Sequence, residues 1–104
     1  AQVEVLRLMN MRLAWSAQHR TLHPADASAV KVFGSEFFVD AYNSMLECFG
    51  AAGLIPADAP GAILRGRVEA GYRNTLILTF GGGTNEVQRD IIAMAALGLP
   101  HYKS

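Results

Sequence analysis

One long segment decides the fold, because it carries the clearest helical pattern in the chain. Residues 24–49 read PADASAVKVFGSEFFVDAYNSMLECF, and apolar residues recur in this segment at steps of three and four positions, as on one face of an α-helix. The residues of this stripe are Val30, Phe33, Phe37, Ala41, Met45 and Cys48. Pro24 suits the first position of a helix, and Asp26 places a carboxylate in the positively polarised first turn. We therefore predict a helix over this segment, ended by Gly50 and Gly53, with the stripe facing the core.

Two shorter helices are predicted at the ends of the chain. The first extends from Val3 to about His19 and is apolar over much of its circumference. The last extends from about Thr84 to Leu97, and either Thr84 or Asn85 is expected to cap it, since both side chains can accept a hydrogen bond from the first turn. The residues expected to face inward from this last helix are Val87, Ile91 and Met94.

The segment between these helices contains a loop and one further helix. Pro, Ala, Asp and Gly dominate residues 54–61, which favours a loop. Apolar residues then follow at a regular four-residue spacing: Leu64, Val68, Tyr72, Leu76 and Phe80. Residues 75–80, TLILTF, would also suit a short buried strand, but the period continues upstream and favours a helix that Gly81–Gly83 ends. The prediction is therefore an all-α, up-down bundle of four helices in a single domain, residues 1–104.

The composition excludes several classes of protein. Nine basic and nine acidic residues give a net charge of zero, so the chain lacks the positive surface that binds nucleic acid. With 51% hydrophobic and 17% charged residues it does not resemble a disordered segment, and its apolar content is high for so small a domain. Part of the apolar surface is therefore expected to face a partner, a cofactor or another part of the same protein.

Cysteine, histidine and hydropathy patterns bear on metals and compartment. Cys48 is the only cysteine, which excludes an intramolecular disulfide and a cysteine-based zinc module. The longest apolar run, residues 91–99, is too short to cross a bilayer, and no segment resembles a signal peptide. His19 and His23 stand four positions apart with no acidic residue between them, so no metal site is predicted. The simplest expectation is a cytoplasmic protein with no metal and no membrane insertion.

Two glycine-containing segments are candidates for contact with a ligand. Gly81–Gly83 and Thr84 precede the last helix, where backbone N–H groups carry positive partial charge and suit a phosphate or an electron-rich ring edge. The alternative for these glycines is a flexible break between two helices. Residues 47–53, ECFGAAG, could likewise present backbone to a phosphate, or could form only the C-terminal cap and turn of the long helix. The residues alone leave both pairs of alternatives open.

Four segments resemble, in the same order, the signature motifs of the acyl-CoA dehydrogenase family. Residues 84–93, TNEVQRDIIA, resemble the family's C-terminal pattern E-G-T-[SA]-[EQ]-I-Q-R and the apolar helix after it. Val68-Glu69 and Arg73-Asn74 resemble P-V-E-x-x-x-R-D, and residues 46–53, LECFGAAG, resemble Q-[IL]-x-G-G-x-G. Residues 28–33, SAVKVF, resemble A-S-x-A-K-x-[FL]. The resemblance covers almost the whole chain, interrupted by one longer loop.

The resemblance implies a fold, a reaction and partners. In this family the subunit has an N-terminal helical domain, a middle β-domain and a C-terminal four-helix domain, and FAD lies between the last two. The enzymes introduce an α,β double bond into an acyl-CoA thioester and pass the electrons to an electron-transfer flavoprotein; their subunits form dimers and tetramers. This chain resembles only the last domain, truncated so that its first helix is absent. The isolated chain is therefore expected to be inactive and to associate through exposed apolar stripes.

The resemblance also implies which residues contact the cofactor. The positions that match contacts to the flavin end of FAD are Gly83, Thr84 and Glu86. The positions that match contacts to the adenosine diphosphate half of a partner subunit's FAD are Glu47, Gly50 and Gly53. Two residues depart from the family pattern in this second set. Glu47 replaces a glutamine and would repel a pyrophosphate, and Ala51 adds a Cβ where close backbone approach is expected.

The position of the catalytic base also departs from the common family pattern. Many members carry the glutamate that removes the α-proton where this chain has Gly82, and glycine cannot act as a general base. Either the base lies on an earlier helix, before Ala1, or this chain belongs to a base-less structural subunit of a mixed tetramer. The Gly-Gly-Gly-Thr sequence also resembles actinobacterial members that act on steroid side chains, so fatty and steroid acyl groups both stay open. The alternative from another class is a non-enzymatic helical interaction module, in which Gly81–Gly83 is a hinge.

Overall fold

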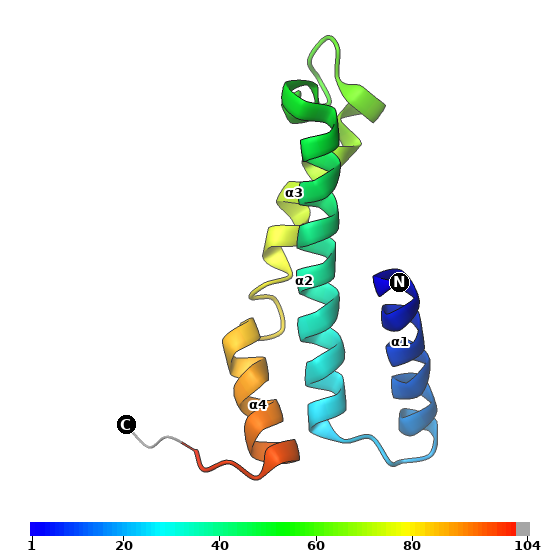
Figure 1. Ribbon diagram of the computed structural model, residues 1–104, viewed down its shortest axis with the longest axis vertical. Coiled ribbons are helices and arrows are strands. Elements are labelled where there is room, and N and C mark those ends of the chain that lie inside the picture. The colour runs from blue at the N-terminus through cyan, green and yellow to red at the C-terminus, as the bar shows by residue number, and fades with distance from the viewer. Residues whose placement is uncertain (102–104) are drawn as a thin grey trace. The chain divides into compact units, whose positions relative to one another are not determined.

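The regular structure of the chain is entirely helical in the computed structural model, which describes residues 1–101 (Figure 1). The helices are α1 (Gln2–Gln18), α2 (Pro24–Phe49), α3 (Arg67–Ile77) and α4 (Asn85–Leu97), with two short 3-10 helices, η1 (Gly50–Leu54) and η2 (Ile63–Gly66). The prediction of an all-α fold with four α-helices is confirmed. Within residues 1–101, no helix is both long and apolar enough to span a membrane.

The ends of α2 agree with the sequence prediction, whereas α3 is shorter than predicted at both ends. Leu64 and Arg65 have φ angles of 48° and 55°, in the left-handed region, so the right-handed helix begins only at Arg67. At the other end α3 stops at Ile77. There the Thr79 hydroxyl donates to the carbonyl oxygen of Leu76 at 2.8 Å, a local bond that competes with helix continuation. The alternative strand over residues 75–80 is not formed, because these residues belong to α3 and the turn after it.

The chain divides into two compact units, and α2 contributes to both. The first unit contains residues 1–34 and the chain from Gly83 onward, and the second contains Ser35–Gly82. The first unit therefore contains α1, the N-terminal part of α2 and α4. The second contains the C-terminal part of α2, both 3-10 helices and α3.

In the first unit, α1 runs antiparallel to the beginning of α2. Leu6 lies close to Gly34, so that a Cβ on this glycine would stand 3.4 Å from the Leu6 Cδ1 atom. One turn and a half further along α1, Arg12 forms an ion pair with Asp26 at 3.7 Å. The partner number falls as the number in α1 rises, which is the antiparallel arrangement that the short connection between the helices favours.

The buried face of α2 differs from the predicted stripe. The buried residues of this helix are Ala25, Ser28, Val32, Ser35 and Leu46, which also recur at helical spacing. The predicted core stripe lies beside them and is only half-buried or exposed, with Met45 38% exposed and Cys48 exposed. Three of these five buried residues are alanine or serine, whose small side chains allow neighbouring backbones to approach closely. The large apolar side chains of Phe38 and Met45 are exposed.

The inward face predicted for α4 is also partly wrong. Val87 is 50% exposed, while Ile91 and Met94 are half-buried as expected. The buried residue of this helix is instead the polar Asn85. Exposed apolar side chains occur on α2 and α4 and are most frequent on α1, in agreement with the excess of apolar residues in the composition.

In the second unit, two glycines permit close packing. Gly71 of α3 lies against the Tyr42 ring of α2, and Gly66 lies against the backbone of Ala57 in the loop. Val68, at the start of α3, is buried, whereas Leu64, Leu76 and Phe80 of the predicted four-residue stripe are exposed. The face of α3 that packs in this unit therefore contains only part of the predicted stripe.

Candidate functional site

The turn before α4 presents open backbone at one glycine. Gly82 and Gly83 have φ angles of 73° and 94°, which residues with a side chain rarely adopt. A Cβ on Gly82 would meet nothing within 4 Å, whereas one on Gly83 would stand 2.9 Å from the Gln88 Nε2 atom. The N–H of Gly81 donates to the carbonyl oxygen of Ile77 at 2.8 Å and ties the turn to the end of α3. The backbone of Gly82 is therefore accessible to a ligand.

Thr84 is the N-cap of α4. Its backbone is extended, with φ −64° and ψ 157°, and its hydroxyl accepts a hydrogen bond from the Val87 N–H at 3.3 Å. Of the two caps that the sequence allowed, the structure has Thr84 in this role, and Asn85 is the first residue of the helix. The N-terminus of α4 is thus a well-formed helix start, with the partial positive charge that such ends carry.

Glu86 places an exposed carboxylate in the first turn of α4. A hydrogen bond from its own backbone N–H lowers the pKa of Glu86, and a hydrogen bond from the Thr84 side chain lowers it further. The charges of Arg89 and Lys31 act in the same direction. The carboxylate is therefore ionised at neutral pH and can accept hydrogen bonds from a ligand.

Lys31 of α2 forms hydrogen bonds with residues on both sides of Thr84. Its Nζ atom donates to the carbonyl oxygen of Gly83 at 2.8 Å and to the Oδ1 atom of Asn85 at 2.6 Å. Asn85 is only 6% exposed. Sequence reasoning assigned no role to Lys31, because both of these acceptors lie far away in the chain.

The cap predicts a measurable contribution of Thr84 to stability. Replacing Thr84 by alanine is expected to lower the free energy of unfolding by about 1 kcal/mol, because the Val87 N–H loses its acceptor. Thr84→Ser keeps the hydroxyl and is expected to retain most of the wild-type stability. Urea unfolding of the full-length variants, followed by circular dichroism, measures the difference. Equal stabilities of the alanine and serine variants would contradict the capping role.

The second predicted contact segment lies at the end of α2 and in η1. Glu47 is exposed, and its Oε1 atom accepts a hydrogen bond from the Asn43 Nδ2 atom at 3.2 Å. Gly50 has a φ angle of 57°, is exposed, and has open space where a Cβ would lie. Gly53 is buried, and an added Cβ would stand 3.0 Å from the Phe49 Cβ atom. In this segment Gly50 presents accessible backbone, while Gly53 allows η1 to pack against the end of α2.

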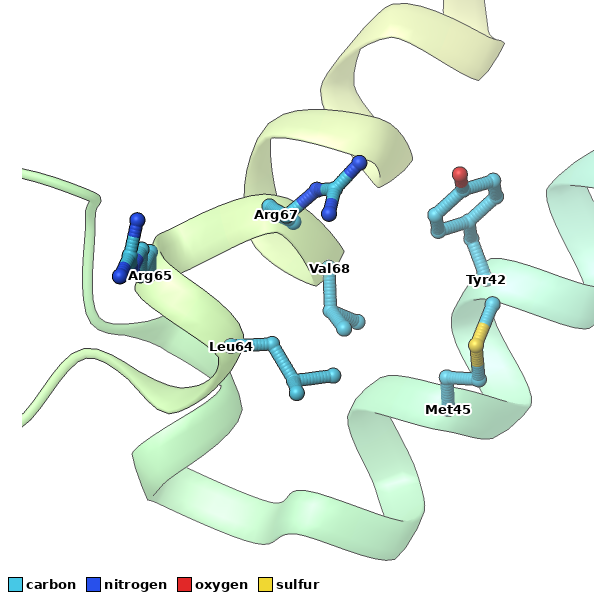
Figure 2. A pocket seen from close by; sticks show the side chains of 6 residues that line it. All are labelled: Tyr42, Met45, Leu64, Arg65, Arg67 and Val68. Atoms are coloured by element: carbon cyan, nitrogen blue, oxygen red, sulfur yellow. The ribbon is translucent and has the colours of Figure 1, made fainter.

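The second unit also contains a hollow of about 490 Å³ that sequence reasoning missed (Figure 2). Its lining residues are Tyr42, Met45, Leu64, Arg65, Arg67 and Val68. Figure 2 shows the Leu64 and Val68 side chains extending into the space that Tyr42 and Met45 face from α2. The left-handed backbone of Leu64, which no local sequence signal indicated, brings its side chain there. None of the residues predicted to contact FAD lines this hollow.

The two histidines that stand four positions apart have separate partners. The His19 ring stacks on Trp15 with centroids 4.1 Å apart, and its Nδ1 atom lies 2.8 Å from the Trp15 carbonyl oxygen. The Nδ1 atom of His23 accepts a hydrogen bond from the Ala25 N–H at 3.2 Å. Within residues 1–101, no three His, Cys, Asp or Glu side chains come together as a possible metal site.

Comparison with known proteins identifies the family to which this helical chain belongs. The model of the acyl-CoA dehydrogenase C-terminal domain matches residues 1–97. The chain therefore belongs to the acyl-CoA dehydrogenase family, as the sequence motifs indicated. It is 56% identical over 103 residues to acyl-CoA dehydrogenase FadE26 of Mycobacterium tuberculosis, and the match covers 96% of this chain and 26% of FadE26.

Two solved structures share the fold. The ChsE4–ChsE5 complex from Mycobacterium tuberculosis superposes with a TM-score of 0.89 at 56% identity, covering 99% of this chain and 26% of the chain it matches. The Tcur3481–Tcur3483 steroid ACAD superposes with a TM-score of 0.92 at 39% identity, covering 98% of this chain and 27% of the chain it matches. Each of these structures combines two different named proteins. The chain thus spans about a quarter of the length of the relatives it matches.

Proposed function

We propose that the protein containing this chain is an FAD-dependent dehydrogenase that introduces an α,β double bond into an acyl-CoA thioester. The observation that carries the proposal is the exposed, left-handed turn at Gly82 and Gly83, followed directly by the capped N-terminus of α4. The sequence of this segment resembles the flavin-contact pattern of the acyl-CoA dehydrogenase family, to which the chain belongs. An open backbone beside a helix N-terminus suits the electron-rich edge of a flavin or a thioester oxygen.

The residues of the turn before α4 suit FAD, whereas in the second segment only the open backbone at Gly50 does. Open space where a Gly82 Cβ would lie leaves room for a ring system to approach this backbone, and the polar residues Thr84 and Glu86 follow in the sequence. Over Gly50 the space is equally open, so the backbone there can approach the adenosine diphosphate half of a partner subunit's FAD, with Gly53 in the same segment. The exposed carboxylate of Glu47 would repel the pyrophosphate at this contact. When bound, FAD supplies the acceptor for the hydride that leaves the β-carbon of the substrate.

The catalytic base is proposed to lie outside this chain. Gly82 stands at the common position of the base and cannot accept a proton. What Gly82 contributes instead is space, since no atom of the unit occupies the volume where a side chain would begin. We propose a bulky substrate, an acyl-CoA with a steroid-type side chain, because this space is open and the Tcur3481–Tcur3483 relative is named a steroid ACAD.

A mixed assembly is the second candidate. The two solved relatives described above are complexes of two different proteins, and Gly82 and Glu47 depart from the residues common in the family at these positions. In this alternative the protein is a base-less structural subunit of a hetero-tetramer. In either case the substrate is an acyl-CoA, and an electron-transfer flavoprotein removes the electrons.

The test is to express the full-length protein alone and measure its bound flavin and its oxidation of acyl-CoA thioesters with straight-chain and steroid side chains. Bound FAD and oxidation of the steroid thioester by the protein alone would support the first proposal. Failure to bind FAD or to turn over until a second acyl-CoA dehydrogenase subunit is added would establish the mixed assembly. If no combination of subunits binds FAD, the dehydrogenase proposal is wrong and a non-enzymatic helical module is the better explanation.

A further inference from the structure

We infer that Lys31 is a positioning residue for the ligand-facing turn: it orients the peptide between Gly83 and Thr84. The inference rests on the proposed function, because the turn matters for catalysis only if FAD or substrate binds there. Lys31 donates to the residue before the N-cap, Gly83, and to the residue after it, Asn85. One ammonium group therefore holds the backbone on both sides of Thr84.

The geometry of the peptide group gives this contact a direction. A trans peptide is planar, and its C=O and N–H point in opposite directions; no peptide among residues 1–101 is cis. Because the Gly83 carbonyl points toward the Lys31 Nζ atom at 2.8 Å, the Thr84 N–H points away from it. Within the described residues this N–H donates to no acceptor. Lys31 thus holds the Thr84 N–H in a fixed direction, available to an acceptor atom of a ligand.

A glycine-rich turn needs such an external constraint. Gly82 and Gly83 both have left-handed φ angles, and glycine exchanges between left-handed and right-handed conformations at little cost. A change of Gly83 to the right-handed conformation would rotate the peptide between Gly83 and Thr84. The Thr84 N–H would then point in a different direction. The bond from Lys31 opposes this rotation, and it is charge-assisted and hence stronger than a bond between neutral groups.

The buried amide of Asn85 makes the contact specific. Asn85 is 6% exposed, and its Oδ1 atom accepts from Lys31 at 2.6 Å. An ammonium with two well-placed oxygen acceptors is held more narrowly than one that reaches solvent. Position 31 therefore requires a side chain as long as lysine with a charged donor at its end. A hydrophobic residue at this position would lack the donor.

The experiment compares variants of the full-length protein, in whichever subunit combination binds FAD. Lys31→Met removes the donor, and Lys31→Arg restores charge and donors. Arg12→Met is the matched control, because it removes an exposed basic residue of the same unit whose ion pair is long, at 3.7 Å. FAD is titrated into the deflavinated protein and followed by flavin fluorescence, and kcat and KM are measured for the acyl-CoA. Circular dichroism and Tm report the helical structure separately.

The expected result is a loss of about tenfold in FAD affinity or a rise of about tenfold in KM for Lys31→Met, as for one lost hydrogen bond. A change in the Kd for FAD would mean that the ring edge of the flavin accepts from the turn, and a change in KM alone would mean that the thioester oxygen does. Lys31→Arg should recover most of the effect, and Arg12→Met should show none.

The inference would be overturned if the folded Lys31→Met variant bound FAD and substrate with the constants of the wild type. Unchanged constants, even with a lower Tm, are the result expected if Lys31 only stabilises the fold. Should Lys31→Met not fold, Lys31→Gln keeps a polar end at this position, and the same unchanged constants would overturn the inference. Absence of FAD binding by the wild type in every subunit combination would instead remove the proposed function, and the inference with it.

Discussion

Replacing Gly66 by alanine is expected to lower the free energy of unfolding by about 2–5 kcal/mol. Two costs add at this position. Gly66 has a φ angle of 68°, which strains a residue with a side chain, and the new Cβ would stand 2.5 Å from the Ala57 Cα atom. Backbone atoms of a packed loop cannot move aside as the end of a side chain can. Urea unfolding of the full-length protein should show the loss as a lower midpoint.

Gly50→Ala is the matched control for this prediction. Gly50 has a similar φ angle of 57°, but nothing lies within 4 Å of the position of its Cβ. Gly50→Ala should therefore lower the free energy of unfolding only by the cost of the left-handed backbone conformation, about 1–2 kcal/mol. If Gly66→Ala and Gly50→Ala were equally destabilising, the close approach to Ala57 would contribute nothing to the stability of the second unit.

The second large effect concerns two helical glycines for which the same substitution is expected to have opposite signs. A Cβ on Gly71 would stand 2.6 Å from the Tyr42 Cζ atom, so Gly71→Ala should cost about 1–3 kcal/mol. A Cβ on Gly34 would stand 3.4 Å from the Leu6 Cδ1 atom, which is near ordinary contact. Gly34→Ala should therefore stabilise by about 0.5–1 kcal/mol, the helix-propensity gain of alanine over glycine.

The double variant Gly71→Ala, Tyr42→Ala isolates the cause. Removing the Tyr42 ring removes the atoms that the new Cβ meets, so the cost of Gly71→Ala should be much smaller in the Tyr42→Ala background. Thermal unfolding of the wild type, the two single variants and the double variant gives the coupling free energy. A coupling near zero, or a destabilising Gly34→Ala, would contradict the packing described for these glycines.

The helix ends with local signals were predictable, and those set by distant contacts were not. Pro24 and Gly50 mark the two ends of α2, and the structure has them where the sequence predicted. The start of α3 depends on Leu64 and Arg65 in the left-handed region, which neither residue favours by itself. The four-residue stripe extended the predicted helix through them, because periodicity carries no information about the packing of the neighbouring loop.

The buried face of α2 was missed for a related reason. Two faces of this helix repeat at helical spacing, one with large apolar residues and one with small residues such as Ala25 and Ser28. Hydrophobic size selects the first face, but close helix packing in this chain uses the second. The cap of α4 could be narrowed to Thr84 or Asn85 because a cap acts on the next three residues, and the structure has Thr84. The role of Lys31 could not be predicted, because its acceptors lie 52 and 54 positions away in the chain.

The division of the chain into its two units has a consequence for the order of events during synthesis. The second unit is continuous, Ser35–Gly82, so all of its residues have been synthesised before α4 is made. The first unit is discontinuous and is completed only by the chain from Gly83 onward. The hydrogen bonds from Lys31 to Gly83 and Asn85 therefore form only after this segment has been made, and they close a long loop. A nascent chain that ends before Gly83 lacks this turn, so the ligand contact proposed for the turn becomes possible only after α4 has been translated.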